Sequence, residues 1–201
     1  MTYREVNRLL ESDETPTISE PLQSLVQAGF NHFKPADFEI FVLRIFEALN
    51  FIGSLTPATG DEGVDILLQD PAGTIIVQCK KYDDATKIGS KELREFLGAI
   101  SHAKAIHGYF VTTTSFTDQA QTFCIDHENI TLIDSQQLKR LFLFAILFSF
   151  DKFGRIHHFL LKDDTNDLGE EFRRQADDLY REYQRELEKM KENIRRRKLH
   201  G

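Results

Sequence analysis

The spacing of apolar residues predicts alternating helices and strands over the central two thirds of the chain. Pro35 fits the first turn of a helix whose broad apolar face continues to Leu49. Shorter apolar runs predict strands near 51–56, 64–69, 74–80, 108–113 and 130–133, with helices near 90–104 and after Thr117. This order predicts an α/β fold in which a mixed β-sheet is covered by helices on both sides.

A β-hairpin is expected where Gly73 separates two of these strands. Successive side chains of a strand point to opposite faces, so Gln78 and Lys80 share one face and Cys79 points to the other. Asp65, near the start of the first strand, is then expected opposite the end of the second. The hairpin therefore brings a carboxylate, an amide and an ammonium group to one edge of the sheet.

The pattern divides the chain into three parts. Residues 1–33 form an N-terminal helical arm, with one amphipathic helix around Val6 and a second short helix around Leu25. This arm is too short for an independent DNA-reading domain. Residues 34–142 form the α/β core, and residues 143–201 are an apolar segment followed by a long C-terminal amphipathic helix, which we expect to be an assembly element.

Residues 141–150 are nearly all apolar, and further apolar residues follow as far as Leu161. A membrane span is not expected, because a spanning helix needs about 20 apolar residues and charged residues bracket a run half as long. Two interpretations stay open: a helix or strand buried in the core, or a buried subunit interface.

The last segment carries an apolar stripe with an eleven-residue repeat, from Leu168 to Ile194. Such a stripe stays nearly straight along a helix or supercoils slightly to the right. The helix could pair with another chain, which predicts a homo-oligomer of at least two subunits, or it could pack back on its own domain. The basic run at 195–198 could touch nucleic acid or simply be solvated.

Composition is that of an ordinary globular protein, with 201 residues and 41% hydrophobic residues. Two cysteines are too few for a disulfide framework, and no apolar run follows a basic start, so we expect a cytoplasmic location. The net charge of −7 argues mildly against a protein that coats nucleic acid. Positive charge is nevertheless concentrated near the hairpin, at Lys80, Lys81, Lys87, Lys91 and Arg94.

The residues at the hairpin fit a metal-dependent nuclease. A hard divalent cation prefers oxygen ligands, which the Asp65 carboxylate, the Gln78 amide and the backbone carbonyl of Cys79 can supply. Lys80 would orient a nucleophilic water and offset charge on the phosphorus in the transition state. The alternative for Asp65 is a turn-capping role, and for Lys80 an ordinary surface position.

These residues resemble the catalytic domain of Mrr-type restriction endonucleases, a branch of the PD-(D/E)xK nucleases in which the middle acid is often glutamine. Gly60 to Asp65 is similar to the family's Gly-Asp-Gly-Gly-(Val/Ile)-Asp segment, except at Glu62, and Gln78-Cys79-Lys80 is similar to its Gln-x-Lys. The other similar segments are Phe38-Glu39, Glu92 to Ala99, Phe110 to Thr117 and Thr131 to Leu138. The resemblance covers roughly residues 34–142.

The resemblance implies a restriction-endonuclease-like fold and a Mg²⁺-dependent (or Mn²⁺-dependent) deoxyribonuclease that leaves a 5′-phosphate, in defence against foreign DNA. It also implies that Glu39 is an additional acid that holds the metal through water, although a helix-surface charge is the alternative. Target choice would then come from a partner protein, an additional domain or assembly. Two other functions stay open: a catalytically silent or weakly active nucleic-acid-binding module, and an RNA nuclease.

Some neighbouring residues have weaker claims to the site. Asp61 and Glu62 could bind a second metal, but acids are common in such turns. Hydroxyls in residues 112–115 could take a phosphate, although helix capping by Ser115 and Thr117 is the stronger prediction. Cys124 and His127, and the neighbours His157 and His158, lack a second ligand pair and are expected to be structural.

Overall fold

The computed structural model describes residues 1–12, 30, 33–57, 63–83, 85–148, 181 and 185. Its elements are α1 (Tyr3–Glu11), α3 (Pro35–Ala48), β1 (Ile52–Leu55), β2 (Ile66–Asp70), β3 (Gly73–Lys80), β4 (Lys87–Ile88), α4 (Ser90–His102), β5 (His107–Thr112), β6 (Ser115–Phe116), α5 (Asp118–Ile125), β7 (Ile130–Ile133) and α6 (Ser135–Phe148).

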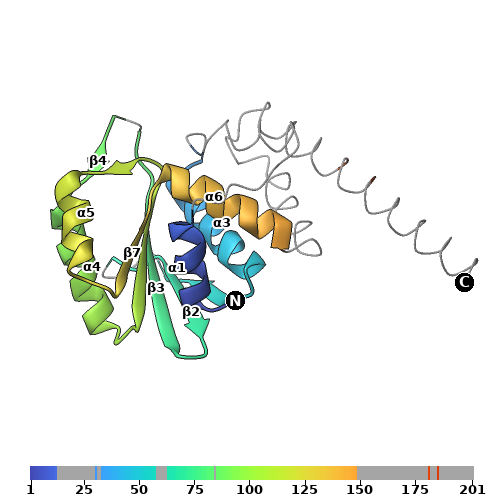
Figure 1. Cartoon of the computed structure of the whole chain (residues 1–201), viewed down its shortest axis with the longest axis horizontal. Helices are drawn as coiled ribbons and strands as arrows, with labels where there is room; N and C mark the ends of the chain where they lie inside the picture. Colours follow the sequence, from blue (N-terminus) through green and yellow to red (C-terminus); the bar gives the residue numbers. More distant parts are fainter. Residues whose placement is uncertain are drawn as a thin grey trace, which may run out of the picture.

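A twisted five-stranded sheet with the order β1-β2-β3-β5-β7 forms the centre of the molecule (Figure 1). β1, β2 and β3 pair antiparallel, whereas β3, β5 and β7 pair parallel. The parallel connections pass through α4 and α5, as parallel neighbours require a crossover. The mixed sheet and the predicted hairpin between β2 and β3 are therefore confirmed.

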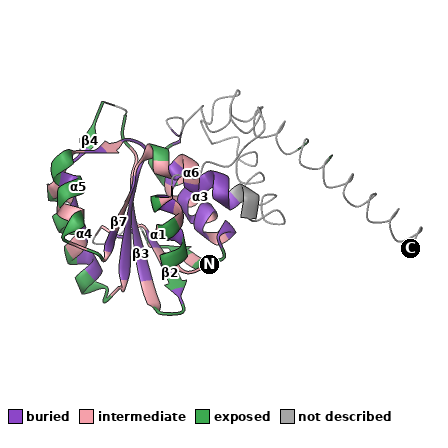
Figure 2. Ribbon diagram, in the orientation of Figure 1, coloured by how far each residue is buried: buried purple, intermediate pink, exposed green. Residues whose placement is uncertain are grey.

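One face of the sheet packs against α1, α3 and α6, whose buried parts are purple in Figure 2. The core on this side is rich in aromatic residues. Pro35 is in the first turn of α3, where its missing N–H costs nothing. The apolar face predicted for this helix is buried throughout, at Phe38, Phe41, Val42, Ile45, Phe46 and Leu49. On β3, Ile75, Val77 and Cys79 face this core.

The opposite face packs against α4 and α5, with Leu93 and Phe96 of α4 among the buried residues (Figure 1). Ile76 of β3 belongs to this second core, so the side chains of β3 alternate between the two faces as the sequence predicts. Cys79 consequently lies on the α3 side, while Gln78 and Lys80 are at positions of the α4 side.

The small second sheet was not predicted. β4 and β6 pair in parallel, with Lys87 opposite Ser115 and Ile88 opposite Phe116. Two-residue strands are too short to give a periodic pattern, so the sequence contains no signal for them. The pairing fastens the segment after β3 to the segment after β5.

Helix α1 of the N-terminal arm packs closely on the core of the α/β unit. Val6 is fully buried and Leu10 nearly so. The Tyr3 backbone N–H donates to the Asp70 carboxylate at 2.9 Å, and the Tyr109 hydroxyl donates to the Tyr3 carbonyl at 3.2 Å. Although α1 is short, it is an integral part of the folded unit. The second helix expected around Leu25 lies outside the described residues.

The apolar run after Ser135 begins as α6, whose Leu141 to Ala145 are buried next to α3. For these residues, the interpretation as a core helix is confirmed. Among the described residues, no helix is both long and apolar enough to span a membrane. The remainder of the apolar segment and the C-terminal stripe lie outside the described residues, apart from Arg181 and Arg185.

Candidate active site

Asp65 lies just before β2, and its carboxylate is held by the end of β3. The backbone N–H of Cys79 donates to Asp65 Oδ2 at 2.6 Å, and Gln78 Nε2 donates to the same oxygen at 2.9 Å. The backbone of Asp65 is also fixed, because its N–H donates to the Val77 carbonyl at 2.9 Å. Asp65 is therefore opposite the end of the second strand, as predicted, and its carboxylate has a defined orientation.

Gln78 is buried, and its amide group lies between Asp65 and Gly63. Since Nε2 points to Asp65, the amide oxygen Oε1 is directed to the other side. A Cβ atom on Gly63 would lie 2.8 Å from this oxygen, and Gly63 also has a positive φ of 83°. Glycine is therefore needed at this turn both for its backbone conformation and for the approach of the Gln78 side chain.

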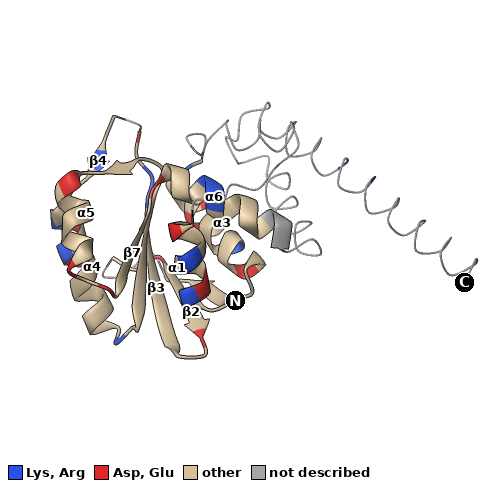
Figure 3. Cartoon of the chain, in the orientation of Figure 1, with Lys and Arg blue, Asp and Glu red and all other residues tan. Residues whose placement is uncertain are grey.

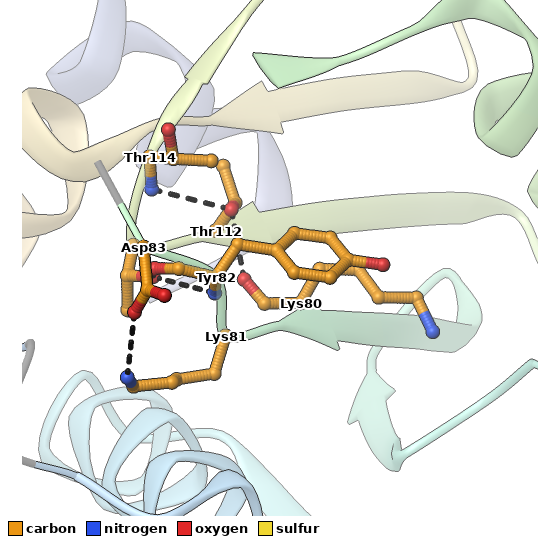
Figure 4. Close-up of polar contacts among 7 residues, drawn as sticks. Lys80, Lys81, Tyr82, Asp83, Thr112 and Thr114 are labelled. Carbon is orange, nitrogen blue, oxygen red and sulfur yellow. Dashed lines mark hydrogen bonds and ion pairs between the residues drawn. The ribbon is translucent and has the colours of Figure 1, made fainter. Parts of the chain in front are cut away.

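Lys80 is the last residue of β3, and its backbone is fixed by β5. Thr112 Oγ1 donates to the Lys80 carbonyl at 2.8 Å, and the Thr113 N–H donates to the same carbonyl at 3.3 Å. The side chain extends away from these contacts (Figure 4). It is half-buried, so the ammonium group starts from a rigid strand end and reaches towards the surface.

Glu39 of α3 belongs to the same neighbourhood, as the electrostatics of Cys79 indicate. Burial raises the pKa of the Cys79 thiol well above its usual value, and the charges of Asp65 and Glu39 raise it further, while Lys80 acts in the opposite direction. These three charged groups therefore lie around the end of β3. The thiol is buried in the core on the α3 side, so the backbone carbonyl is the candidate contribution of Cys79 to metal binding.

The donor set fits a hard divalent cation. It consists of the Asp65 carboxylate and the Gln78 amide oxygen, with the Cys79 carbonyl and Glu39 close by, all of them oxygen donors. The space beside Gln78 Oε1 is one that a Cβ atom on residue 63 would fill. Within the described part of the chain no three His, Cys, Asp or Glu residues cluster as a metal site, and Asp61 and Glu62 lie outside that part.

The threonines after β5 do not form a phosphate pocket. Thr112, Thr113 and Thr114 are 0–3% exposed, and their hydroxyls donate to the backbone carbonyls of Lys80, Tyr82 and Thr86, respectively. The prediction that these hydroxyls could take a phosphate is therefore wrong. Thr117 caps α5 by accepting the Ala120 N–H at 3.2 Å, as predicted, whereas Ser115 pairs within β6 and caps no helix.

The basic residues near the hairpin differ in their exposure. Lys87, Lys91 and Arg94 are exposed on β4 and α4, and Lys81 is half-buried with its Nζ 4.0 Å from Asp83 Oδ1. Figure 3 shows that charged residues are concentrated on helices and loops, while the central strands carry few of them. Positive charge is thus available on the surface beside the end of β3.

Cys124 and His127 lie at the C-terminal end of α5 and in the turn that follows it. His127 stacks on Phe123 with ring centroids 4.1 Å apart, and its Nδ1 lies 2.7 Å from the Phe123 carbonyl oxygen. Burial raises the pKa of the Cys124 thiol to about 11, so this thiol stays protonated at neutral pH. His157 and His158 lie outside the described residues.

The class of protein follows from a comparison with known families. Residues 30–142 match the family model of the Mrr catalytic domain, described as a restriction endonuclease. The chain therefore belongs to the Mrr-type restriction endonuclease family, and the resemblance seen in the sequence is confirmed. Restriction endonucleases of this fold generally use divalent metal ions.

Two curated proteins are similar to this chain. The type IV methyl-directed restriction enzyme EcoKMrr of Escherichia coli (strain K12) is 33% identical over 132 residues, which cover 62% of this chain and 41% of that enzyme. The uncharacterized protein y4cE of Sinorhizobium fredii (strain NBRC 101917 / NGR234) is 30% identical over 115 residues, covering 55% of this chain and 28% of that protein. The chain thus spans less than half the length of either relative.

Among solved structures, the DNA modification-dependent restriction endonuclease AspBHI has a similar fold. The TM-score is 0.50 at 18% sequence identity, over 73% of this chain and 41% of that one. At this identity the likeness concerns the fold alone, and it confirms the restriction-endonuclease-like architecture.

Sequence reasoning missed two supports of the site. Gly63 was noticed only as part of a family segment, and its positive φ and close approach to Gln78 depend on the folded turn. The sequence suggests Thr112 and Thr113 as phosphate-binding residues, whereas in the structure they fix the backbone of the strand that carries Lys80. Because their partners are more than 30 residues away in sequence, no local pattern could have shown this.

Proposed function

We propose that this chain is a metal-dependent DNA endonuclease that hydrolyses phosphodiester bonds and acts in defence against foreign DNA in the cytoplasm. The observation that carries this proposal is the convergence of the Asp65 carboxylate, the Gln78 amide and Lys80 where β2 begins and β3 ends. The family membership supports it, as does the similarity to EcoKMrr, a methyl-directed restriction enzyme. The proposed product carries a 5′-phosphate.

The residues of the site have different proposed roles. The N–H groups of Cys79 and Gln78 orient the Asp65 carboxylate, so that it can serve as a ligand without rearranging. Lys80, held at its carbonyl by Thr112, places a positive charge where negative charge develops on the phosphoryl oxygens and can orient the attacking water. Preorganised charge of this kind lowers the barrier because little reorganisation is needed during the reaction.

Asp65, Gln78 and the Cys79 carbonyl would hold the metal, with Glu39 acting through a water molecule. Mg²⁺, or Mn²⁺ in its place, would supply Lewis acidity towards the phosphate and lower the pKa of a bound water. Glu39 reaches this region from α3, so the helix packed on the sheet and the hairpin would contribute to one centre. Removal of the divalent ion with EDTA should stop cleavage.

Cleavage assays with purified protein test the proposal. Supercoiled plasmid, linear duplex, single-stranded DNA and RNA are incubated in Mg²⁺, Mn²⁺ or EDTA, and the ends are tested for a 5′-phosphate. Asp65→Ala removes a ligand and Lys80→Ala removes electrostatic stabilisation, so each should lower the cleavage rate by about 10²-fold or more. Thr122→Val, at an exposed position of α5, is a control that should cut like the wild type.

The other functions predict different results in the same assay. Cleavage of RNA but not DNA would replace the proposed substrate. Binding without cleavage in any metal would indicate a silent module. Plasmid cleavage at the wild-type rate by both Asp65→Ala and Lys80→Ala would show that the assigned site is wrong, whichever nucleic acid is cut.

Assembly and target choice are also proposed here. We infer that the part of residues 143–201 that follows α6 holds subunits together, because its apolar stripe resembles that of pairing helices and a double-strand break requires two active sites. Target recognition would come from a partner protein or an additional domain. Sedimentation of the full chain and of Leu179→Glu/Tyr183→Glu tests the assembly proposal, since charges at a buried contact should loosen it.

A further inference from the structure

The segment that follows β3 is fastened along its length to the segment that follows β5. Thr112, Thr113 and Thr114, which we call the threonine clasp, donate side-chain hydrogen bonds to the carbonyls of Lys80, Tyr82 and Thr86, respectively. β4 and β6 then continue the pairing, and the Thr117 N–H donates to the Ile88 carbonyl at 2.9 Å. The loop after Lys80 is therefore anchored by buried side chains.

Thr113 forms hydrogen bonds with both backbone groups of Tyr82. Its hydroxyl accepts the Tyr82 N–H at 3.0 Å and donates to the Tyr82 carbonyl at 2.8 Å, so one side chain satisfies both backbone groups of Tyr82. Thr113 itself is only 3% exposed. A backbone fixed in this way gives the attached side chain a defined starting direction. Because the backbone is already ordered, little of its conformational entropy is lost when a ligand binds.

The side chain presented by this contact is an exposed tyrosine beside Lys80. Tyr82 is 37% exposed, and its ring and the Lys80 side chain extend from the strand end in the same direction, whereas Lys81 extends elsewhere (Figure 4). Within the described part of the chain, the Tyr82 hydroxyl has no hydrogen-bond partner. Tyr82 therefore presents a hydrogen-bond donor beside the lysine proposed to stabilise the transition state, on a backbone that Thr113 fixes.

We propose that Tyr82 is a substrate-binding residue whose hydroxyl donates a hydrogen bond to a DNA phosphate adjacent to the one attacked, and that Thr113 is the positioning residue that presents it. The inference rests on the proposed function, which places DNA at Lys80. Cα atoms two residues apart are separated by at most about 7 Å, so both side chains can reach the same DNA strand. Hydroxyls of this kind are common donors to phosphate and fix the position of the strand without reading its sequence.

Binding of a fluorescein-labelled duplex in EDTA is the direct test, because no cleavage occurs. Tyr82→Phe removes only the hydroxyl, and a hydrogen bond to a charged group contributes about 1.5–3 kcal/mol, so affinity should fall roughly 10-fold or more. Since no positive charge is lost, the slope of log affinity against log salt concentration should not change. In the metal-loaded enzyme, Tyr82→Phe should raise KM and leave kcat unchanged, because the hydrogen bond is present both in the bound substrate and in the transition state.

Variants of Thr113 test the positioning role. Thr113→Val keeps the shape but removes the hydroxyl, and should reproduce part of the loss seen in Tyr82→Phe. Thr113→Ser restores the hydroxyl and should restore the affinity, which a purely steric role would not predict. Thr122→Val makes the same chemical change at an exposed position of α5 and should bind like the wild type. Circular dichroism and thermal melts establish that each variant is folded.

The outcomes separate this inference from the proposed function. If the wild type binds and cuts DNA but Tyr82→Phe does so equally well, the inference is wrong and the proposed function stands. An intact affinity in Tyr82→Phe with a loss only in Tyr82→Ala would indicate a ring contact and also overturn the phosphate contact. If the wild type neither binds nor cuts DNA, both proposals fail. Tyr82→Phe decides the matter if Thr113→Val does not fold.

Discussion

At the scale of single residues, the site depends on Gly63 as much as on the groups that carry charge. Its positive φ of 83° and the 2.8 Å approach of Gln78 Oε1 to the position of a Cβ atom leave no room for a side chain. Gln78 also orients Asp65 through Nε2. A side chain at residue 63 should therefore displace the Gln78 amide and, with it, the Asp65 carboxylate, although Gly63 itself has no chemical role.

We predict that Gly63→Ala lowers both stability and cleavage. A left-handed backbone costs about 1–2 kcal/mol for a residue with a Cβ atom, and displacement of Gln78 should lower activity about 10- to 100-fold, as for other groups that orient metal ligands. Chemical denaturation and plasmid cleavage measure the two effects. Gly98→Ala is the matched control: its Cβ meets nothing within 4 Å, so α4 should gain rather than lose stability.

His107 supplies a second prediction at this scale, concerning pH. Burial lowers its pKa to about 4, and its Nε2 lies 2.9 Å from Thr131 Oγ1 and 3.5 Å from Asn7 Nδ2. The neutral ring is favoured in the folded state, so stability should be full above the ordinary pKa of about 6.5 and should decrease as the pH falls towards 4. A shift of this size corresponds to a loss of up to roughly 3 kcal/mol.

Urea denaturation at pH 7 and pH 4.5 measures this effect. The loss of stability between the two values should be smaller in His107→Gln than in the wild type. His102→Gln, at an exposed position, should lose as much as the wild type. Equal losses in wild type and His107→Gln would show that His107 does not govern the acid sensitivity.

At the scale of elements, the strong periodic patterns were sufficient to predict most of the fold. The broad apolar face of α3 and the hairpin of β2 and β3 are long enough to identify their own type, and their alternation fixed which residues share a face. Asp65, Gln78 and Lys80 could therefore be placed together in advance. β4 and β6 could not be predicted, because each has only two residues and they pair segments that are distant in the sequence.

The N-terminal helix shows where pattern reasoning reaches its limit. Its amphipathic face was recognised, but nothing local indicates that Val6 is fully buried or that Arg140 of α6 contacts the Leu9 carbonyl at 3.3 Å. Docking of α1 depends on complementary surfaces formed by segments more than 100 residues apart. The structure thus makes α1 part of the same hydrophobic core as α3 and α6.

We predict that Val6→Asp strongly destabilises the whole α/β unit. A buried carboxylate without a partner costs several kcal/mol, and α1 contributes directly to the shared core. Arg8→Asp introduces the same side chain at an exposed position of α1 and should change stability by at most about 1 kcal/mol. Thermal melting measures both variants. Similar melting temperatures for the two would mean that α1 is dispensable.

At the scale of the whole molecule, charge and length both bear on how DNA is bound. The net charge of −7 disfavours DNA in general, and the chain spans less than half of the relatives it matches. Exposed positive charge lies near the site at Lys87, Lys91 and Arg94. Attraction to phosphate should therefore come from a few local contacts, with little sequence preference in the isolated chain.

We predict that the purified chain binds duplex DNA weakly and loses affinity steeply as salt rises. If Lys80, Lys81, Lys87, Lys91 and Arg94 each neutralise one phosphate, the slope of log affinity against log salt is about −4.5. Lys91→Gln and Arg94→Gln should each reduce the magnitude of this slope by about 0.9. Lys104→Gln, beyond the other end of α4, is the matched control and should leave it unchanged. Fluorescence anisotropy at several salt concentrations gives these slopes, and tight sequence-specific binding at physiological salt would contradict the prediction, because it would require a base-reading element elsewhere in the chain.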